Sequence, residues 1–101
     1  MRLILLTICV WICLVSGAAL AVIDCSRAKT NADLMICSNS RLAAAQEEMA
    51  WTFRQALRRG VDQILLRDSQ RTWYENERNV CNDAPCLLKA FDERSAELAN
   101  Y

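Results

Sequence analysis

The chain has 101 residues, with 12 basic and 12 acidic side chains, six cysteines and no histidine. This length suits one small domain, and the zero net charge offers no basic surface of the kind that nucleic-acid binding requires. The lack of histidine excludes a Ser-His-Asp triad, a Cys-His pair and any histidine-ligated metal. A binding or structural role is therefore favoured over catalysis, and no enzyme is expected.

The first part of the chain is apolar and carries no charge from Leu3 to Ile23. An apolar stretch followed by the small residues of SGAALA is typical of a secretory signal peptide. We expect residues 1–21 to be a cleaved signal and residues 22–101 to form a periplasmic or secreted domain that binds neither membrane nor nucleic acid. The alternative is an uncleaved anchor, because the apolar run is long enough to span a bilayer.

The predicted domain favours helices, because alanine and charged residues dominate and alternating apolar runs are short. A short helix is predicted to begin after Thr30, with Asp33 at the acidic position of a capping box, and to end near Cys37. A second helix is predicted over 41–59, with Gly60 as its C-terminal stop. Its apolar residues share one face: Leu42, Ala45, Met49, Phe53 and Leu57.

A third helix is predicted over 62–79, and the short link at Gly60 makes it antiparallel to the second helix. One of its faces carries Leu66, Gln70, Trp73, Glu77 and Val80. Two polar residues on an otherwise apolar face indicate a hydrogen-bonded internal network. We expect Trp73 in the core, and Gln70 and Glu77 bonded to Arg94 on the facing helix.

The fourth helix is predicted to begin after Asp83, a capping residue, with Pro85 in its first turn. Its inner face is predicted to carry Leu87, Phe91, Arg94 and Leu98. The predicted fold is therefore all-α, a small disulfide-stapled helical hairpin or bundle of three to four helices.

The four cysteines of this domain predict disulfide bonds rather than a metal or redox site. An even number of cysteines in a short exported chain is typical of a disulfide framework. The hairpin gathers Cys25, Cys37, Cys81 and Cys86 at the end opposite Gly60, and all three pairings are sterically allowed. Zinc is disfavoured because only one gap between neighbouring cysteines fits a structural zinc site, and the C-x-x-C redox motif is absent. No metal and no cofactor are expected.

The order and spacing of these residues resemble the LprI-like family, formerly a domain of unknown function and named after a lysozyme inhibitor. The resemblance runs from Asp24 to Leu98 and begins with DCSRAKTNADLMIC, which ends at Cys37. It continues through the other matching positions: Leu42, Met49, Phe53, Gln70, Trp73, Cys81, Cys86, Phe91, Arg94 and Leu98. The resemblance implies a helical binding protein that inhibits lysozyme-type muramidases, with Gln70, Trp73, Phe91 and Arg94 as family-signature core residues.

Several positions depart from the family pattern. The family often has Asp where Ala45 stands, and Tyr where Phe53 and Phe91 stand. It usually has Arg four residues after the tryptophan, where this chain has Glu77 followed by Arg78. If that arginine contacts a partner, the contact is lost or shifted in this protein.

Two functions are consistent with these patterns. An inhibitor needs a rigid surface that blocks a cleft lined by carboxylates. Its candidate contacts are Trp51, Tyr74 and Arg78, because Trp, Tyr and Arg are favoured at interface centres. Glu77, next to Arg78, is a further candidate contact. The two aromatic residues could instead pack internally. The second function is an envelope structural or interaction protein with no lysozyme target. Glu47 and Glu48 are adjacent, and Glu75 and Glu77 are two residues apart, so neither acidic pair converges on a helix. No catalytic carboxylate pair is therefore predicted.

Overall fold

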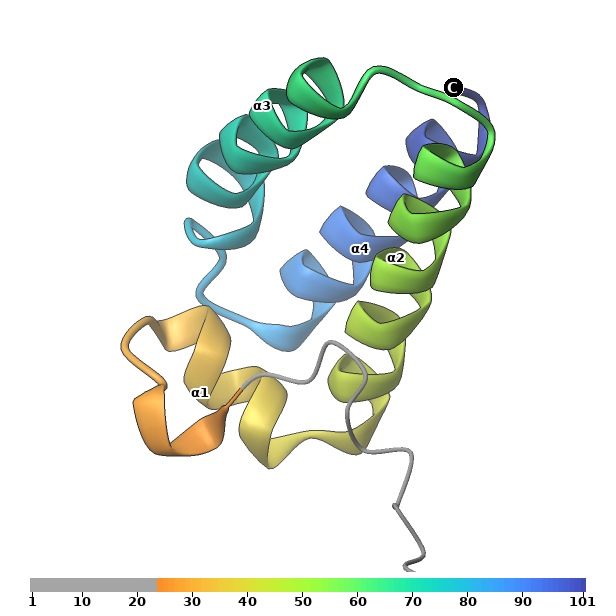
Figure 1. Ribbon diagram of the computed structural model, residues 1–101. Helices are drawn as coiled ribbons and strands as arrows, with labels where there is room; N and C mark the ends of the chain where they lie inside the picture. Colours follow the sequence, from red (N-terminus) through yellow and green to blue (C-terminus); the bar gives the residue numbers. More distant parts are fainter. Residues whose placement is uncertain (1–23) are drawn as a thin grey trace, which may run out of the picture.

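The computed structural model describes residues 24–101, and the predicted signal peptide lies outside this range. Within residues 24–101 the chain forms four α-helices and no strand, which confirms the predicted all-α fold (Figure 1). The elements in chain order are η2 (Cys25–Arg27), α1 (Asn31–Ser38), α2 (Ser40–Arg58), α3 (Gln63–Trp73), η3 (Tyr74–Arg78) and α4 (Ala84–Ala99). No helix in this part of the chain is long and apolar enough to cross a membrane.

Side-chain caps set the helix starts. The hydroxyl of Thr30 accepts a hydrogen bond from the backbone N–H of Asp33, whose carboxylate accepts one from Thr30 in return, as in a capping box. The caps of the three longer helices are Asn39, Asp62 and Asp83. Between α2 and α3 the chain reverses at Gly60, whose φ of +88° favours glycine.

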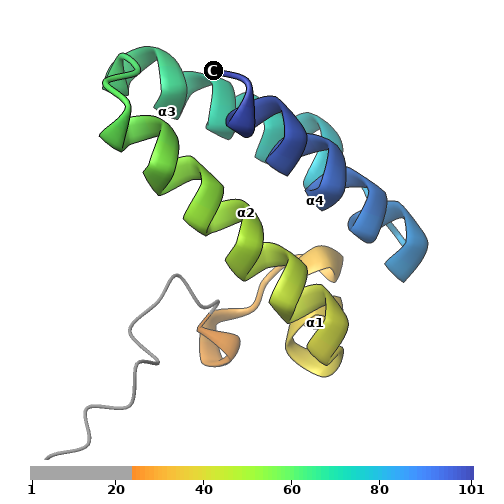
Figure 2. The same cartoon turned by 90° about the vertical axis from the view of Figure 1, so that its right-hand side faces the viewer.

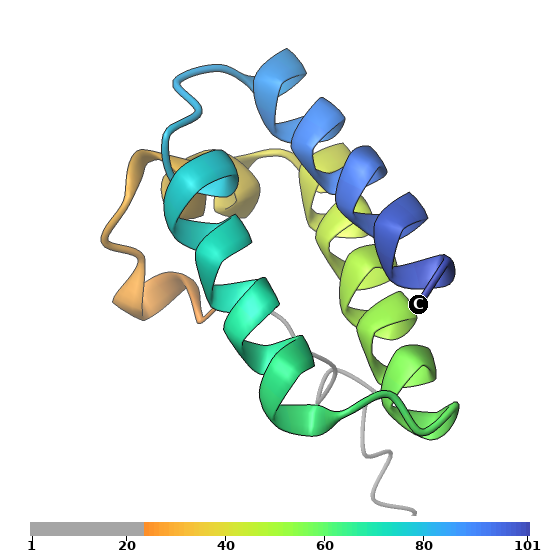
Figure 3. The ribbon, with the colours of Figure 1, turned by 90° about the horizontal axis from the view of Figure 1, so that it is seen from above.

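The helices pack unevenly. α2 packs mainly against α4, and the two run side by side in the same direction, while α3 runs the opposite way (Figures 1 and 2). Seen from above, α3 stands apart from α2 (Figure 3). The antiparallel order of the second and third helices therefore agrees with the prediction, but the closely packed pair is α2 and α4.

This arrangement changes which face of α2 is buried. Its buried residues are Leu42, Gln46, Met49, Thr52 and Ala56. The predicted apolar face is only partly covered, since Ala45, Phe53 and Leu57 are half-buried. The physical reason is that α4 covers one side of α2, whereas α3 lies too far away to cover the other.

The third predicted helix does not continue regularly to Asn79. After Trp73 the chain forms the π-helical turn η3, in which the backbone N–H of Asn79 bonds the carbonyl of Tyr74 at 2.9 Å. A π-helical turn holds one more residue than an α-helical turn, so later side chains are rotated. As a result Arg78 is only 3% exposed, whereas Glu77 is exposed and Val80 is 59% exposed. The predicted inward positions of Glu77 and Val80 are wrong for this reason.

The four cysteines within residues 24–101 form two local disulfides, Cys25–Cys37 and Cys81–Cys86, with Cα separations of 5.8 Å and 5.5 Å. The first ties η2 to α1, and the second ties the link after η3 to the first turn of α4. Figure 1 shows α1 and the start of α4 at the end of the bundle away from the α2–α3 link. Disulfides are typical of an oxidising, extracellular environment. Within residues 24–101 there is no cluster of acidic, cysteine or histidine side chains that could hold a metal.

Candidate functional site

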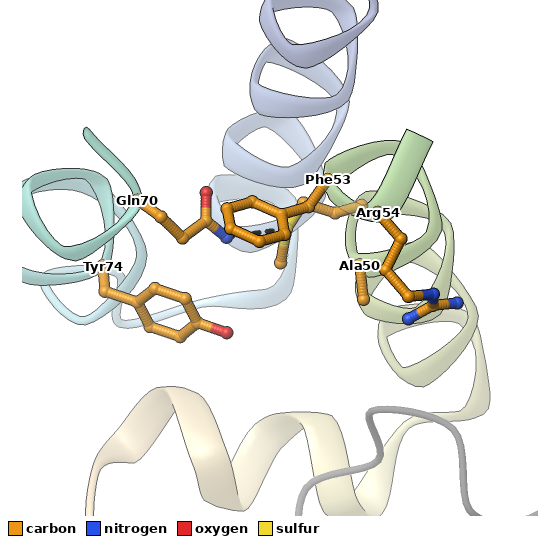
Figure 4. Close-up of a pocket in the computed structure, with 6 residues that line it drawn as sticks. Ala50, Phe53, Arg54, Gln70 and Tyr74 are labelled. Carbon is orange, nitrogen blue, oxygen red and sulfur yellow. Dashed lines mark hydrogen bonds between the residues drawn. The ribbon is translucent and has the colours of Figure 1, made fainter. Parts of the chain in front are cut away.

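A groove of about 230 Å³ opens where α2 and α3 stand apart. Its lining residues come from α2, α3 and η3 (Figure 4): Met49, Ala50, Phe53, Arg54, Gln70 and Tyr74. The Phe53 and Tyr74 rings and the methyl group of Ala50 make the walls mainly apolar. Figure 4 shows Tyr74 reaching from η3 toward α2, with Arg54 on the α2 side and α1 beneath.

Gln70 closes the inner end of the groove. Its side-chain Nε2 donates to Sδ of Met49 at 3.0 Å, and its Oε1 accepts from Nε of Arg94 at 2.8 Å. These two bonds link α3 to both α2 and α4. The predicted hydrogen bond between Gln70 and Arg94 is therefore present.

Arg94 lies on α4 and is 2% exposed. Besides Gln70, it donates to Oγ of Ser69 at 2.9 Å and to the carboxylate of Glu97 at 3.1 Å. Glu77 is not among its partners, which corrects the prediction of a Gln70–Glu77 pair. The π-helical turn carries Glu77 to the surface, so the carboxylate beside Arg94 comes from its own helix instead.

Arg78 joins three elements at the α1 end of the groove. Its Nη2 donates to Oδ1 of Asp33 at 2.8 Å and to Oε1 of Gln46 at 3.2 Å. Its Nη1 donates to the side chain of Asn79 at 2.6 Å, and its guanidinium lies 4.8 Å from the centre of the Tyr74 ring. A side chain buried in this way holds α1, α2 and η3 together. The prediction that Arg78 contacts a partner is corrected, because the residue is internal.

Trp73 lies in the core beside this network and is 4% exposed. Its ring is 5.7 Å from that of Phe91 and meets the Tyr74 ring edge to face at 5.2 Å. These separations fall in the range of favourable aromatic pairs. The structure thus brings Gln70, Trp73, Phe91 and Arg94 to the same interior, between α3 and α4.

The remaining predicted contacts divide between the surface and the groove. Trp51 is 56% exposed on α2 and does not line the groove, so the alternative that it packs internally is wrong. Tyr74 is half-buried and forms one groove wall. Glu77 is exposed on η3.

Two titratable groups around Arg78 have shifted pKa values. Partial burial alone would raise the pKa of Asp33, but hydrogen bonds from Arg78 and from two backbone N–H groups, together with the charge of Arg78, bring it below the ordinary 3.8. Burial raises the pKa of Tyr74 above its ordinary value, against the opposing effect of the Arg78 charge. At neutral pH the structure therefore holds an ionised Asp33 beside a protonated Tyr74.

The stability of the fold should depend on pH through Asp33. Its pKa is lower in the folded chain, so ionised Asp33 stabilises the fold above the ordinary value of 3.8, and this contribution is lost as the pH falls through the folded value. We expect the difference in free energy of unfolding between wild type and Asp33→Asn to shrink as the pH falls from about 5 through the lowered pKa of Asp33. Urea denaturation at a series of pH values measures it.

Asp92→Asn is the matched control for this measurement. Asp92 is exposed on α4 and makes no hydrogen bond or ion pair within residues 24–101. The loss of stability caused by Asp33→Asn should change with pH more steeply than the loss caused by Asp92→Asn. An equal pH dependence of the two losses would contradict the interaction of Asp33 with Arg78.

Comparisons with protein-family models, with curated proteins and with solved structures each gave no match. The assignment to the LprI-like family therefore stays a prediction from the motifs quoted above.

Two parts of the site lie beyond what the sequence pattern predicts. The Asp33–Arg78 pair joins residues 45 positions apart, and no spacing rule links residues so distant. The groove wall on α2 is partly indicated by the sequence, because Ala50, Phe53 and Arg54 follow the spacing that places helical side chains side by side. That spacing indicates a shared face but not whether the face is covered.

Proposed function

We propose that this chain is an exported, disulfide-stapled helical binding protein that inhibits a lysozyme-type muramidase. The observation that carries the proposal is the open, mainly apolar groove between α2 and α3, set in a frame held by two disulfides and two buried arginines. The enzyme class comes from the resemblance to the LprI-like family, and export from the predicted signal peptide.

Rigidity of the frame supports a role in binding. A partner that meets an already ordered surface avoids part of the entropy loss that accompanies association. Here the groove is closed at its inner end by Gln70 and flanked at the α1 end by the Arg78 network. Both sets of bonds hold the groove walls in place before a partner arrives.

The surface beside the groove offers an exposed anchor. Trp51 is 56% exposed and lies one helical turn before Arg54, so both side chains lie on neighbouring parts of α2. Tryptophan and arginine are the residue types most enriched among strong interface contacts. A partner that fills the groove would therefore also reach the Trp51 ring.

A muramidase titration tests this proposal. We expect purified, oxidised protein to reduce the lysis of bacterial cell walls by a lysozyme in a dose-dependent and saturable way. Trp51→Ala should weaken inhibition by about tenfold or more, the effect of losing a modest interface anchor. Ile64→Ala is the matched control, because Ile64 is 76% exposed on α3 and does not line the groove. Muramidase activity unchanged at high micromolar excess of the protein would overturn the proposal.

The second candidate is an envelope interaction protein without a muramidase target. The burial of Arg78 favours it, because the only arginine near the position at which the resemblance expects one is 3% exposed and holds the fold together. Under this alternative the groove binds another envelope protein, and the muramidase titration gives no inhibition.

A further inference from the structure

The groove between α2 and α3 presents hydrogen-bonding capacity that the described part of the chain does not use. The guanidinium of Arg54 makes no ion pair or hydrogen bond within residues 24–101, and neither does the hydroxyl of Tyr74. The amide nitrogen of Gln70 donates only to the sulfur of Met49, which is a weak acceptor. Three polar groups of one groove can therefore still donate hydrogen bonds.

The character of these groups indicates the chemistry of an occupant. A guanidinium and an amide nitrogen can only donate, and a phenol hydroxyl donates readily. Burial raises the pKa of Tyr74, which keeps this hydroxyl protonated at neutral pH. Donors beside a positive charge complement a carboxylate, and the neighbouring Phe53 ring complements an apolar group. The groove therefore suits an acidic group next to an apolar one.

The size of the groove indicates how much of an occupant enters it. Pockets that bind small molecules usually measure about 300–1,000 Å³, whereas this groove measures about 230 Å³. It is large enough for one bulky side chain but small for a whole ligand. Anchoring side chains at protein interfaces occupy pockets of this kind.

We propose that the groove receives a large apolar side chain of a partner protein, and that a carboxylate next to that side chain pairs with Arg54. The inference rests on the proposed function as a binding protein and identifies the binding element. Because Arg54 is half-buried, the pair would be partly shielded from water, which strengthens a charge-assisted hydrogen bond. For a muramidase, the acidic residues that flank its cleft could supply the carboxylate.

An NMR titration with small probes tests the inference directly. The oxidised, isotope-labelled protein is titrated with acetyl-Phe-Glu-amide, and separately with acetyl-Phe-Gln-amide. We expect both to shift the resonances of Ala50, Phe53 and Gln70, and the acidic peptide to bind at least about threefold more tightly, as one partly exposed charge pair allows. Arg54→Gln should abolish this preference. Arg58→Gln is the matched control and should keep it, because Arg58 lies one turn further along α2 and does not line the groove.

Other results would overturn the inference. These are no shift at the solubility limit of the peptides, shifts away from the groove, equal affinities, or a preference that survives in Arg54→Gln. Groove shifts that depend on protein concentration alone would assign the groove to a second copy of the chain. Tighter binding of decanoate than of either peptide would assign it to a fatty acid.

The inference and the proposed function can fail separately. Inhibition of a muramidase that is unchanged in Arg54→Gln, together with no preference for the acidic peptide, would overturn the inference but leave the inhibitor function. A preference for the acidic peptide without any inhibition would overturn the inhibitor function but leave the groove as a binding site.

Discussion

Replacing Trp73 with alanine is expected to lower the free energy of unfolding by about 3–5 kcal/mol, the range for removing a large buried aromatic side chain. Trp73 is 4% exposed and packs on Phe91 and Tyr74. Its loss would leave a cavity between α3 and α4, which are also joined by the hydrogen bonds of Arg94 to Ser69 and Gln70. Urea denaturation followed by circular dichroism measures the change.

Trp51→Ala is the matched control, since it removes the same side chain from a position that is 56% exposed. We expect a change within about 0.5 kcal/mol, as for ordinary surface substitutions. Equal losses for the two variants would show that Trp73 is not in the core.

Replacing Arg78 with alanine is the second large effect, and we expect a loss of about 3 kcal/mol. Removing one partner of a buried ion pair usually costs about 3–5 kcal/mol. The lower end applies here, because the Asp33 side chain is 20% exposed and water can partly replace the lost bond. The substitution also leaves the Gln46 carbonyl oxygen without its hydrogen-bond donor. Chemical denaturation at neutral pH measures this loss.

Arg71→Ala is a demanding control for the effect of burial. Arg71 pairs with Asp68 at 2.7 Å, close to the 2.8 Å of the Arg78–Asp33 pair, but its side chain is 69% exposed. Exposed pairs contribute about 0–1 kcal/mol. A comparable loss in both variants would contradict the buried position of Arg78.

The helices and their starts could be predicted from the sequence because they depend on local chemistry. Thr30, Asp62 and Asp83 were expected at helix starts, and their side chains accept hydrogen bonds from backbone N–H groups as caps do. Gly60 was expected as a stop and has the positive φ of one. Such features need only the neighbouring residues, so tertiary packing does not change them.

The inner face of η3 could not be predicted, because regular helical spacing fails after Trp73. The π-helical turn exchanges the expected places of Glu77 and Arg78. Arg78 gains three side-chain partners on the inside. A Glu77 side chain in the same inward position would instead bring a second acidic group close to Asp33. The inward arginine of this chain, Arg78, thus stands one residue after the position at which the LprI-like resemblance expects an arginine.

The groove was also beyond prediction, since it depends on how far α3 stands from α2. Phe53 was expected in a closed helical hairpin and instead forms part of an open wall. Nothing in the sequence distinguishes Arg54, because a lone arginine on a helix usually belongs to a solvated face. Its interest comes from Phe53, Gln70 and Tyr74, which only the tertiary structure brings near it.

The Arg78 network is central to both the fold and the groove. Asp33 lies on α1, Gln46 on α2 and Arg78 on η3, so a single guanidinium sets how these elements meet. The same guanidinium packs on the Tyr74 ring, which forms one wall of the groove. The shape of the proposed binding site therefore depends on the inward position of Arg78.

A double-mutant cycle on the pair of Asp33 and Arg78 tests this position most directly. The free energies of unfolding of wild type, Asp33→Asn, Arg78→Gln and the double variant are compared at neutral pH. A direct contact predicts a coupling of about 1–3 kcal/mol between the two substitutions. Losses that add to within about 0.5 kcal/mol would show that the two side chains do not interact, and would contradict an inward Arg78.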